Sequence, residues 1–121
     1  MARVLVIEDD KDLRSFIVKI MKTEKHEVVA AANGAAGMKL LQENPVDLVI
    51  TDIFMPEQDG ISTIIELQSD YPAVKIIVIS GGGRLESVNF LELATNLGAD
   101  QFLQKPFSVE EMVAMVRGLL R

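Results

Sequence analysis

The sequence of 121 residues contains no cysteine and a single histidine. Without cysteine, the chain forms no disulfide framework and offers no thiolate to a metal ion. One histidine cannot supply a zinc site either, because protein-bound zinc is held by several thiolate or imidazole groups. We expect that histidine, His26, to lie at the surface between a helix and a strand and to have no functional role.

Long apolar runs and clusters of basic residues are also missing. No run approaches the roughly 20 apolar residues of a membrane-spanning helix, and residues 1–3 lead directly into a strand-like run, which leaves no room for a signal peptide. The formal net charge is −6, whereas a domain that grips nucleic acid needs a basic footprint for the phosphates. We therefore expect a soluble, cytoplasmic domain that contacts neither a membrane nor nucleic acid directly.

Apolar residues make up 49% of the chain, which is enough for one domain with one core. Short apolar runs of strand length alternate with stretches in which apolar residues recur at helical spacing. The predicted strands cover residues 4–7, 28–31, 48–50, 76–79 and 101–104. The predicted helices run from Asp10 or Asp12 to Met21, from Gly34 to Glu43, from Asp59 or Gly60 to Tyr71, from Glu86 to Leu97, and from Ser108 to Leu120.

Capping residues support the ends of these helices. Asn33 stands at the start of the second helix, and Gly98 is a candidate for a left-handed residue after the fourth. Ser108 and Glu111 have the spacing of a capping box. The alternation of strands and helices predicts an α/β fold, in which helices cover both faces of a parallel sheet through right-handed crossovers.

Polar side chains stand at the carboxyl ends of four predicted strands. Glu8 and Asp9 follow the first strand, and Asp52 follows the third. Ser80 follows the fourth strand, and Lys105 follows the fifth. Because ligands of open α/β sheets bind outside the carboxyl ends of the strands, these residues mark one candidate site.

The residue types at this edge favour phosphoryl chemistry. Three neighbouring carboxylates raise one another's pKa unless a cation joins them, and Mg²⁺ is a hard cation that prefers oxygen ligands. A carboxylate beside such an ion can attack phosphorus and form an aspartyl phosphate. Lys105 would supply positive charge, and the Ser80 hydroxyl and the Gly81 N–H could donate to the phosphoryl group.

Each of these residues also has a simpler interpretation. Asp52 could cap a turn, and Glu8 and Asp9 could complement the dipole of the helix that follows. Lys105 could be a solvated loop residue, and Phe102 could be a core or edge aromatic. The meeting of different polar groups at one sheet edge favours a functional site over these separate explanations.

Four motifs at these strand ends, taken together, resemble a bacterial two-component response-regulator receiver domain, of the single-domain kind found in chemotaxis regulators. The motifs are Val6-Ile7-Glu8-Asp9-Asp10, Thr51-Asp52 through Gly60, Val78-Ile79-Ser80-Gly81 and Phe102 through Phe107. The resemblance covers essentially the whole chain, residues 1–121, as one domain. It implies a flavodoxin-like (βα)5 fold, a doubly wound sheet of five parallel strands in the order 2-1-3-4-5.

The resemblance implies a metal site and a phosphoacceptor. Asp52 resembles the aspartate that accepts the phosphoryl group. Asp9 resembles the direct ligand of Mg²⁺, for which Mn²⁺ is a possible substitute, and Glu8 would act mainly through water. Phe54 would give its backbone carbonyl to the metal. The same bulky residue lies near the path of the hydrolysing water, so its size is expected to affect how long the phosphoryl group persists.

The resemblance also implies a switch. Ser80 resembles the hydroxyl that moves toward the phosphoryl group, and Phe102 resembles the aromatic ring that follows it. Lys105 resembles the lysine that contacts the phosphoryl group, and the peptide bond before Pro106 is commonly cis in the family. The loop that starts at Gly81 is slightly longer than is usual, so the choice of partner is expected to differ.

The family resemblance implies a signalling role rather than an enzyme acting on separate substrates. The phosphoryl donor would be a sensor histidine kinase or a histidine phosphotransfer protein. Phosphorylation would reshape the surface of the fourth helix, fifth strand and fifth helix, to which an unidentified target or effector domain binds. The domain itself is expected to be a monomer or a weak dimer.

The same fold also supports other functions, each of which requires residues in a different arrangement. A degenerate receiver, acting as an interaction module without phosphorylation, would lack a site residue, and none is missing. A flavodoxin would have a neutral phosphate loop after the first strand, where this chain has acids. A haloacid-dehalogenase-type phosphatase would have a second aspartate at the position of Phe54.

Overall fold

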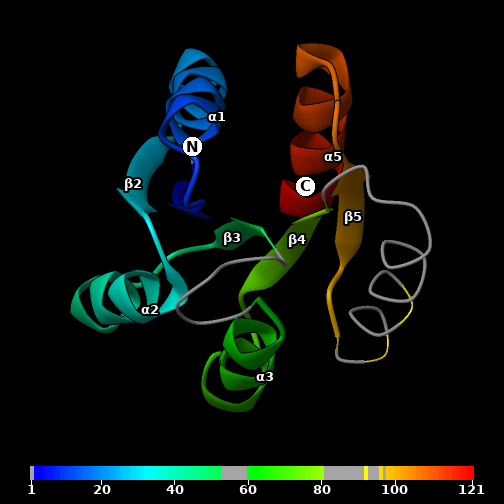
Figure 1. Cartoon of the computed structure of the whole chain (residues 1–121). Coiled ribbons are helices and arrows are strands. Elements are labelled where there is room, and N and C mark those ends of the chain that lie inside the picture. Colours follow the sequence, from blue (N-terminus) through cyan, green and yellow to red (C-terminus); the bar gives the residue numbers. More distant parts are fainter. Residues whose placement is uncertain (1, 53–59, 81–91, 93–95, 97) are drawn as a thin grey trace.

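Five parallel strands form a sheet in the order β2-β1-β3-β4-β5 in the computed structural model (Figure 1). The structure describes residues 2–52, 60–80, 92, 96 and 98–121. The strands are β1 (Arg3–Ile7), β2 (Glu27–Ala31), β3 (Leu48–Asp52), β4 (Lys75–Ser80) and β5 (Gln101–Gln104). The predicted flavodoxin-like strand order is therefore confirmed.

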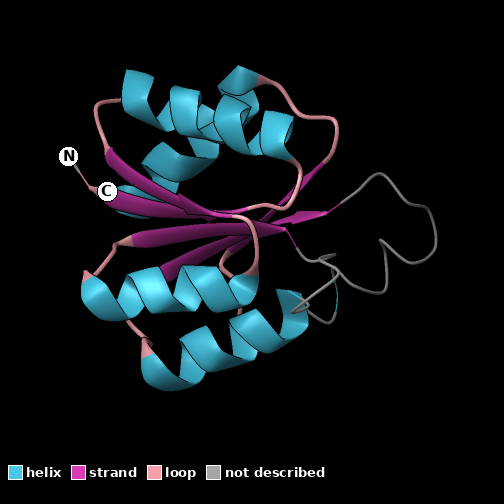
Figure 2. Cartoon of the chain, turned by 60° about the vertical axis from the view of Figure 1, so that its left-hand side comes forward, coloured by secondary structure: helices cyan, strands magenta, loops and turns pink. Residues whose placement is uncertain are grey.

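Helices cover both faces of the sheet (Figure 2). In the described part of the chain they are α1 (Lys11–Thr23), α2 (Gly34–Glu43), α3 (Gly60–Asp70) and α5 (Val109–Leu120). None of these helices is long and apolar enough to cross a membrane. Of the helix predicted over residues 86–97, only Glu92 and Asn96 are among the described residues, and both are helical.

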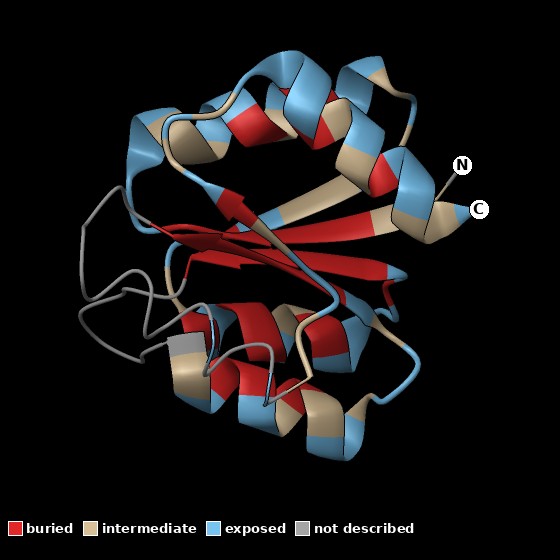
Figure 3. Ribbon diagram, turned by 90° about the vertical axis from the view of Figure 1, so that its right-hand side faces the viewer, coloured by how far each residue is buried: buried red, intermediate tan, exposed pale blue. Residues whose placement is uncertain are grey.

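The core consists of two apolar layers, one on each face of the sheet (Figure 3). Successive side chains of a strand point to opposite faces. Val4 and Val6 of β1 accordingly pack in the layer with α1 and α5, whereas Leu5 and Ile7 pack in the layer with α2 and α3. Every residue of β3 is buried, which explains why the central strands read as continuous apolar runs.

The central strand continues two residues further than the sequence predicts. The apolar run ends at Ile50, but β3 includes Thr51 and Asp52. Thr51 aligns with Ile7 of β1 on one side and with Val78 of β4 on the other. Because ladder partners exist on both sides, the backbone stays extended although the side chains become polar. Asp52 is thus the last residue of the central strand rather than the first residue of a turn.

Capping interactions are present at the ends of several helices, and those of Ser108 and Gly98 are among the predicted ones. The Asp10 carboxylate accepts hydrogen bonds from the backbone N–H groups of Asp12 and Leu13 at 2.9 and 3.2 Å, and caps α1. Ser108 and Glu111 form the complete capping box at the start of α5. Gly98 has a φ of 107°, the left-handed conformation predicted for it.

Polar contacts join the chain near the amino ends of the strands. The backbone N–H of Ala2 donates to His26 Nδ1 at 3.1 Å. His26 is half-buried between α1 and β2 and therefore has a structural contact that the sequence does not indicate. Beside it, Arg117 of α5 donates to both carboxylate oxygens of Glu24 at 2.8 and 3.2 Å. This pair links the end of α1 to the end of α5.

Gly37 marks a close approach of α2 to the sheet, and its substitution should be destabilising. A Cβ atom at Gly37 would lie 2.5 Å from Cδ1 of the buried Ile7. We expect Gly37→Ala to lower the free energy of unfolding by about 1–3 kcal/mol through overpacking. Gly118→Ala in α5 is the control, because no atom beyond the adjoining backbone of its own helix lies within 4 Å of its Cβ position; this substitution should raise the free energy of unfolding by about 0.5–1 kcal/mol. Urea unfolding of both variants measures the difference, and equal effects would contradict the close packing.

Candidate metal and phosphoryl site

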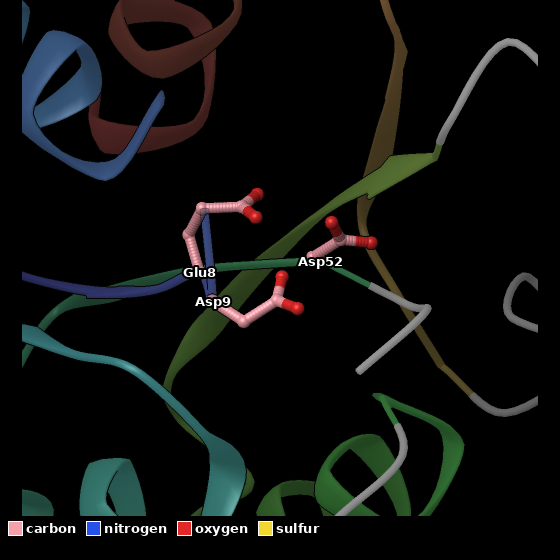
Figure 4. A group of neighbouring side chains, drawn as sticks. All are labelled: Glu8, Asp9 and Asp52. Atoms are coloured by element: carbon pink, nitrogen blue, oxygen red, sulfur yellow. The ribbon is translucent and has the colours of Figure 1, made fainter. Parts of the chain in front are cut away.

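Three carboxylates lie close together between β1 and β3, where the direction in which successive strands are added to the sheet reverses. Ile7 aligns with Thr51, so the next residues, Glu8 and Asp52, are neighbours at the carboxyl edge of the sheet. One carboxylate oxygen from each of Glu8, Asp9 and Asp52 lies within 4.8 Å of the others. Figure 4 shows the three side chains extending into one region, with Glu8 and Asp9 coming from the end of β1 and Asp52 from the end of β3. The predicted acidic cluster is thus present.

The three acids differ in exposure. Glu8 is 1% exposed and Asp52 is 3% exposed, whereas Asp9 is open to solvent. The site therefore has a buried floor and one acid at its mouth. A ligand from solvent meets Asp9 first, while Asp52 is held at the end of the rigid central strand.

Lys105 reaches into this cluster from the end of β5. Its Nζ atom lies 2.7 Å from Asp52 Oδ2 and 3.5 Å from Glu8 Oε1. The backbone N–H of Lys105 donates to the Ser80 carbonyl at 2.8 Å, and the Lys105–Pro106 peptide bond is cis, as the family resemblance implies. The backbone hydrogen bond thus fixes the main chain of Lys105, and the ammonium group of Lys105 offsets the charge of two buried acids.

The electrostatics of the site follow from burial and from the mutual arrangement of these charges. Burial, with the nearby charge of Asp52 and the neighbouring carboxyl group of Asp9, raises the pKa of Glu8 from 4.5 to about 7, although the Asp10 N–H and Lys105 oppose the rise. Burial alone would lower the pKa of Lys105. The hydrogen bond to Asp52 and the charges of both acids outweigh it, so the pKa of Lys105 is raised. A cation bound beside Glu8 would therefore stabilise its ionised form.

Two hydrogen bonds, one from the loop after β1 and one from α1, hold Glu8. The Asp10 N–H donates to Glu8 Oε2 at 3.1 Å. The guanidinium group of Arg14 donates to the Glu8 backbone carbonyl at 2.9 Å. Sequence reasoning missed Arg14, because a cation on an amphipathic helix six residues after an acid carries no distinctive signal. Only the fold shows that the first turn of α1 folds back over the loop.

The predicted switch residues occupy the same end of the sheet. Asp52 aligns with Ile79 of β4, and the next residue, Ser80, is fully buried at the end of that strand. Phe102 of β5 is half-buried and packs against the core layer of α2 and α3. The remaining predicted site residues, Phe54 and Gly81, lie outside the described residues.

The donor set suits a hard divalent cation. All its ligand atoms are carboxylate oxygens, which are the ligands that Mg²⁺ prefers. Glu8 Oε1 is buried and has no hydrogen-bond partner within the described part of the chain; its nearest cation is Lys105 at 3.5 Å. A buried carboxylate oxygen in this condition is stabilised by a metal or by water held on a metal.

Comparison with known proteins points to one family. The sequence model of the response regulator receiver domain matches residues 4–117. The response regulator receiver protein CpdR of Brucella abortus is 35% identical over 125 residues, which cover 99% of this chain and 98% of CpdR. A crystal structure of a response regulator receiver domain protein from Clostridium thermocellum superposes with a TM-score of 0.91 at 26% identity, covering 99% of this chain and 94% of that one.

Other relatives are longer. The transcriptional regulatory protein CpxR of Klebsiella pneumoniae is 36% identical over 121 residues, covering 100% of this chain but only 50% of CpxR. The chain therefore spans about half the length of several curated relatives that it matches.

Proposed function

Because this chain belongs to the response regulator receiver domain family, we propose that Asp52 accepts a phosphoryl group in a two-component phosphorelay. Residues 1–121 would act as one signalling domain. It would promote only its own phosphorylation and dephosphorylation and would not turn over a separate substrate. The contact that supports this proposal best is the 2.7 Å pair between Asp52 and Lys105, at the centre of a cluster of acids.

The proposed reaction is the transfer of a phosphoryl group from a phosphohistidine to Asp52. A carboxylate oxygen of Asp52 forms the new O–P bond while the N–P bond of the phosphohistidine breaks, and the imidazole leaves with the electron pair of that bond. Asp52 suits this role because it ends a strand that is paired on both sides, so its carboxylate is held in place.

The acids would hold Mg²⁺ during this transfer, with Mn²⁺ as a possible substitute. Asp9 and Asp52 would be direct ligands, and Glu8 would act mainly through water. The Phe54 carbonyl would complete the protein ligands. When bound, the ion neutralises charge on the phosphoryl oxygens and on the carboxylates. Lys105 would exchange its contact with Asp52 for one with a phosphoryl oxygen.

The signal would leave the site through Ser80 and Phe102. The Ser80 hydroxyl would donate to the new phosphoryl group, together with the Gly81 N–H. Because Ser80 ends the strand beside β5, its movement would open space that the ring of Phe102 enters. The surface formed by the fourth helix, β5 and α5 would then change shape. The charge of the phosphoryl group would thus shift the equilibrium between two conformations of this surface.

The partners follow from this reaction. The phosphoryl donor would be a sensor histidine kinase or a histidine phosphotransfer protein in the cytoplasm, and the target would be a protein or an effector domain. The net charge of −6 favours protein partners for this domain, with any contact to DNA made by another domain. The domain itself would be a monomer or a weak dimer.

Intact-protein mass spectrometry after incubation with acetyl phosphate tests the proposal. We expect a gain of about 80 Da, one phosphoryl group, in the presence of Mg²⁺ and no gain in EDTA. A protein that binds Mg²⁺ but gains no mass, even with a histidine kinase as donor, would contradict the proposal. That result would favour the alternative of an interaction module that acts without phosphorylation.

A further inference from the structure

Arg14 is the one arginine or lysine side chain, among the described contacts, that holds the backbone of the acidic loop. It lies in the first turns of α1 and is half-buried. Its Nη1 atom donates to the backbone carbonyl of Glu8 at 2.9 Å. We propose that Arg14 is a positioning residue for the metal site, acting through this carbonyl. The inference rests on the proposed function, because it concerns the metal that phosphoryl transfer would use.

The carbonyl that Arg14 holds belongs to the peptide between the two acids of the loop. The orientation of this peptide sets ψ of Glu8 and φ of Asp9, and so the directions in which both side chains leave the main chain. Neighbouring bonds fix the ends of the loop: Glu8 N–H donates to the Ala31 carbonyl at 3.0 Å, and Arg14 N–H donates to the Asp10 carbonyl at 2.8 Å. Arg14 therefore holds the central peptide of an already anchored turn.

The acids need such a constraint because their like charges repel. Glu8, Asp9 and Asp52 are kept within 4.8 Å of one another, and Asp9 is exposed and so has room to turn away. A loop that relaxes on removal of Arg14 would let Asp9 separate from Asp52. Metal binding would then have to restore the arrangement, which lowers the observed affinity.

The direction in which Mg²⁺ affinity changes on removal of Arg14 distinguishes a positioning role from a purely electrostatic one. Arg14 carries a positive charge close to a site for a divalent cation. If the charge alone mattered, its removal would make Mg²⁺ bind more tightly. If Arg14 positions the loop, its removal makes Mg²⁺ bind more weakly although the site has become more negative.

Titration with Mg²⁺ by isothermal calorimetry on wild type, Arg14→Gln, Arg14→Lys and Lys11→Gln tests the proposal. We expect about tenfold weaker binding by Arg14→Gln, in the range found for residues that orient metal ligands. Arg14→Lys should recover part of the loss, since an ammonium group can donate to the same carbonyl. Lys11 is an exposed cation of the same helix, so Lys11→Gln should bind Mg²⁺ equally or slightly more tightly.

Circular dichroism melting checks that each variant folds, and Arg14→Met replaces Arg14→Gln if the latter does not. Unchanged or tighter Mg²⁺ binding by the neutral variant, with a wild type that binds Mg²⁺ and takes up the phosphoryl group, would overturn the role of Arg14 alone. Absence of Mg²⁺ binding by the wild type would overturn both this inference and the metal site of the proposed function.

Discussion

Asp52→Asn is expected to abolish phosphoryl incorporation while the protein remains folded. The amide cannot attack phosphorus, and no other carboxylate ends the central strand. The substitution removes the 2.7 Å ion pair with Lys105 but also removes repulsion between Asp52 and the neighbouring acids. The free energy of unfolding should therefore change by only about 1 kcal/mol, less than the loss from breaking a buried pair without such relief.

Asp47→Asn is a matched control for this experiment. Asp47 precedes β3 and is exposed at the opposite end of the strand, where its carboxylate accepts a hydrogen bond from the Arg3 N–H at 2.9 Å. An asparagine oxygen can accept the same bond. Mass spectrometry after treatment with acetyl phosphate and Mg²⁺ should show the wild-type gain in Asp47→Asn and none in Asp52→Asn. Retained labelling of Asp52→Asn would mean that the acceptor lies elsewhere.

Glu8→Gln is expected to stabilise the metal-free protein while weakening its affinity for Mg²⁺. Burial, with the charge of Asp52, raises the pKa of Glu8 from 4.5 to about 7. A raised pKa means that the folded protein holds the proton more tightly than the unfolded chain does. Ionised Glu8 therefore destabilises the fold by about 3 kcal/mol above the folded pKa. Glutamine keeps an acceptor for the Asp10 N–H and carries no charge.

The pH dependence of this difference has a definite sign. Between pH 4.5 and about 7 the folded protein binds more protons at Glu8 than the unfolded chain, so stability falls as the pH rises through this window. We expect Glu8→Gln to match the wild type near pH 4.5 and to be more stable near pH 8, by urea unfolding in EDTA. Comparing the two proteins at each pH cancels the contribution of the other titrating groups.

Added Mg²⁺ should reverse the order of stability. Binding stabilises whichever protein binds the ion more tightly, and the wild type retains all three carboxylates. If the stability difference between the wild type and Glu8→Gln in EDTA does not change between about pH 5 and about pH 8, ionised Glu8 does not destabilise the fold as expected. A greater stabilisation of Glu8→Gln than of the wild type by Mg²⁺ would contradict a role of Glu8 in metal binding.

The sequence predicted the fold and the composition of the site well because both depend on patterns along the chain. Continuous apolar runs mark strands that are buried on both faces, and the polar residues directly after them must lie at one sheet edge. Glu8, Asp9, Asp52 and Lys105 are indeed brought together. The raised pKa of Glu8 was expected from like charges, but the largest cause is burial, which depends on side-chain packing.

Hydrogen bonds between residues that are not related by helix or strand periodicity could not be predicted from the sequence. Nothing in the spacing of Arg14 or His26 indicates a hydrogen bond to the backbone of Glu8 or Ala2. The apolar run predicts that β3 ends at Ile50, whereas the strand continues to Asp52. Prediction from sequence depends on apolar side chains, but a strand continues as long as its backbone has hydrogen-bonding partners. The roles of Ser80 and Phe102 as switch residues stay predictions.

The central position of β3 places the candidate acceptor on a part of the domain that opens late. Amide hydrogens in a strand that is buried and paired on both sides exchange with solvent mainly when the whole molecule unfolds, whereas exposed loops exchange through local fluctuations. The candidate acceptor thus stands at the end of one of the three strands that are paired on both sides, whereas Asp9 stands on the loop after β1 and is exposed. A signal that begins at Asp52, as proposed, would therefore have to travel by rearrangement of the less protected elements around this strand.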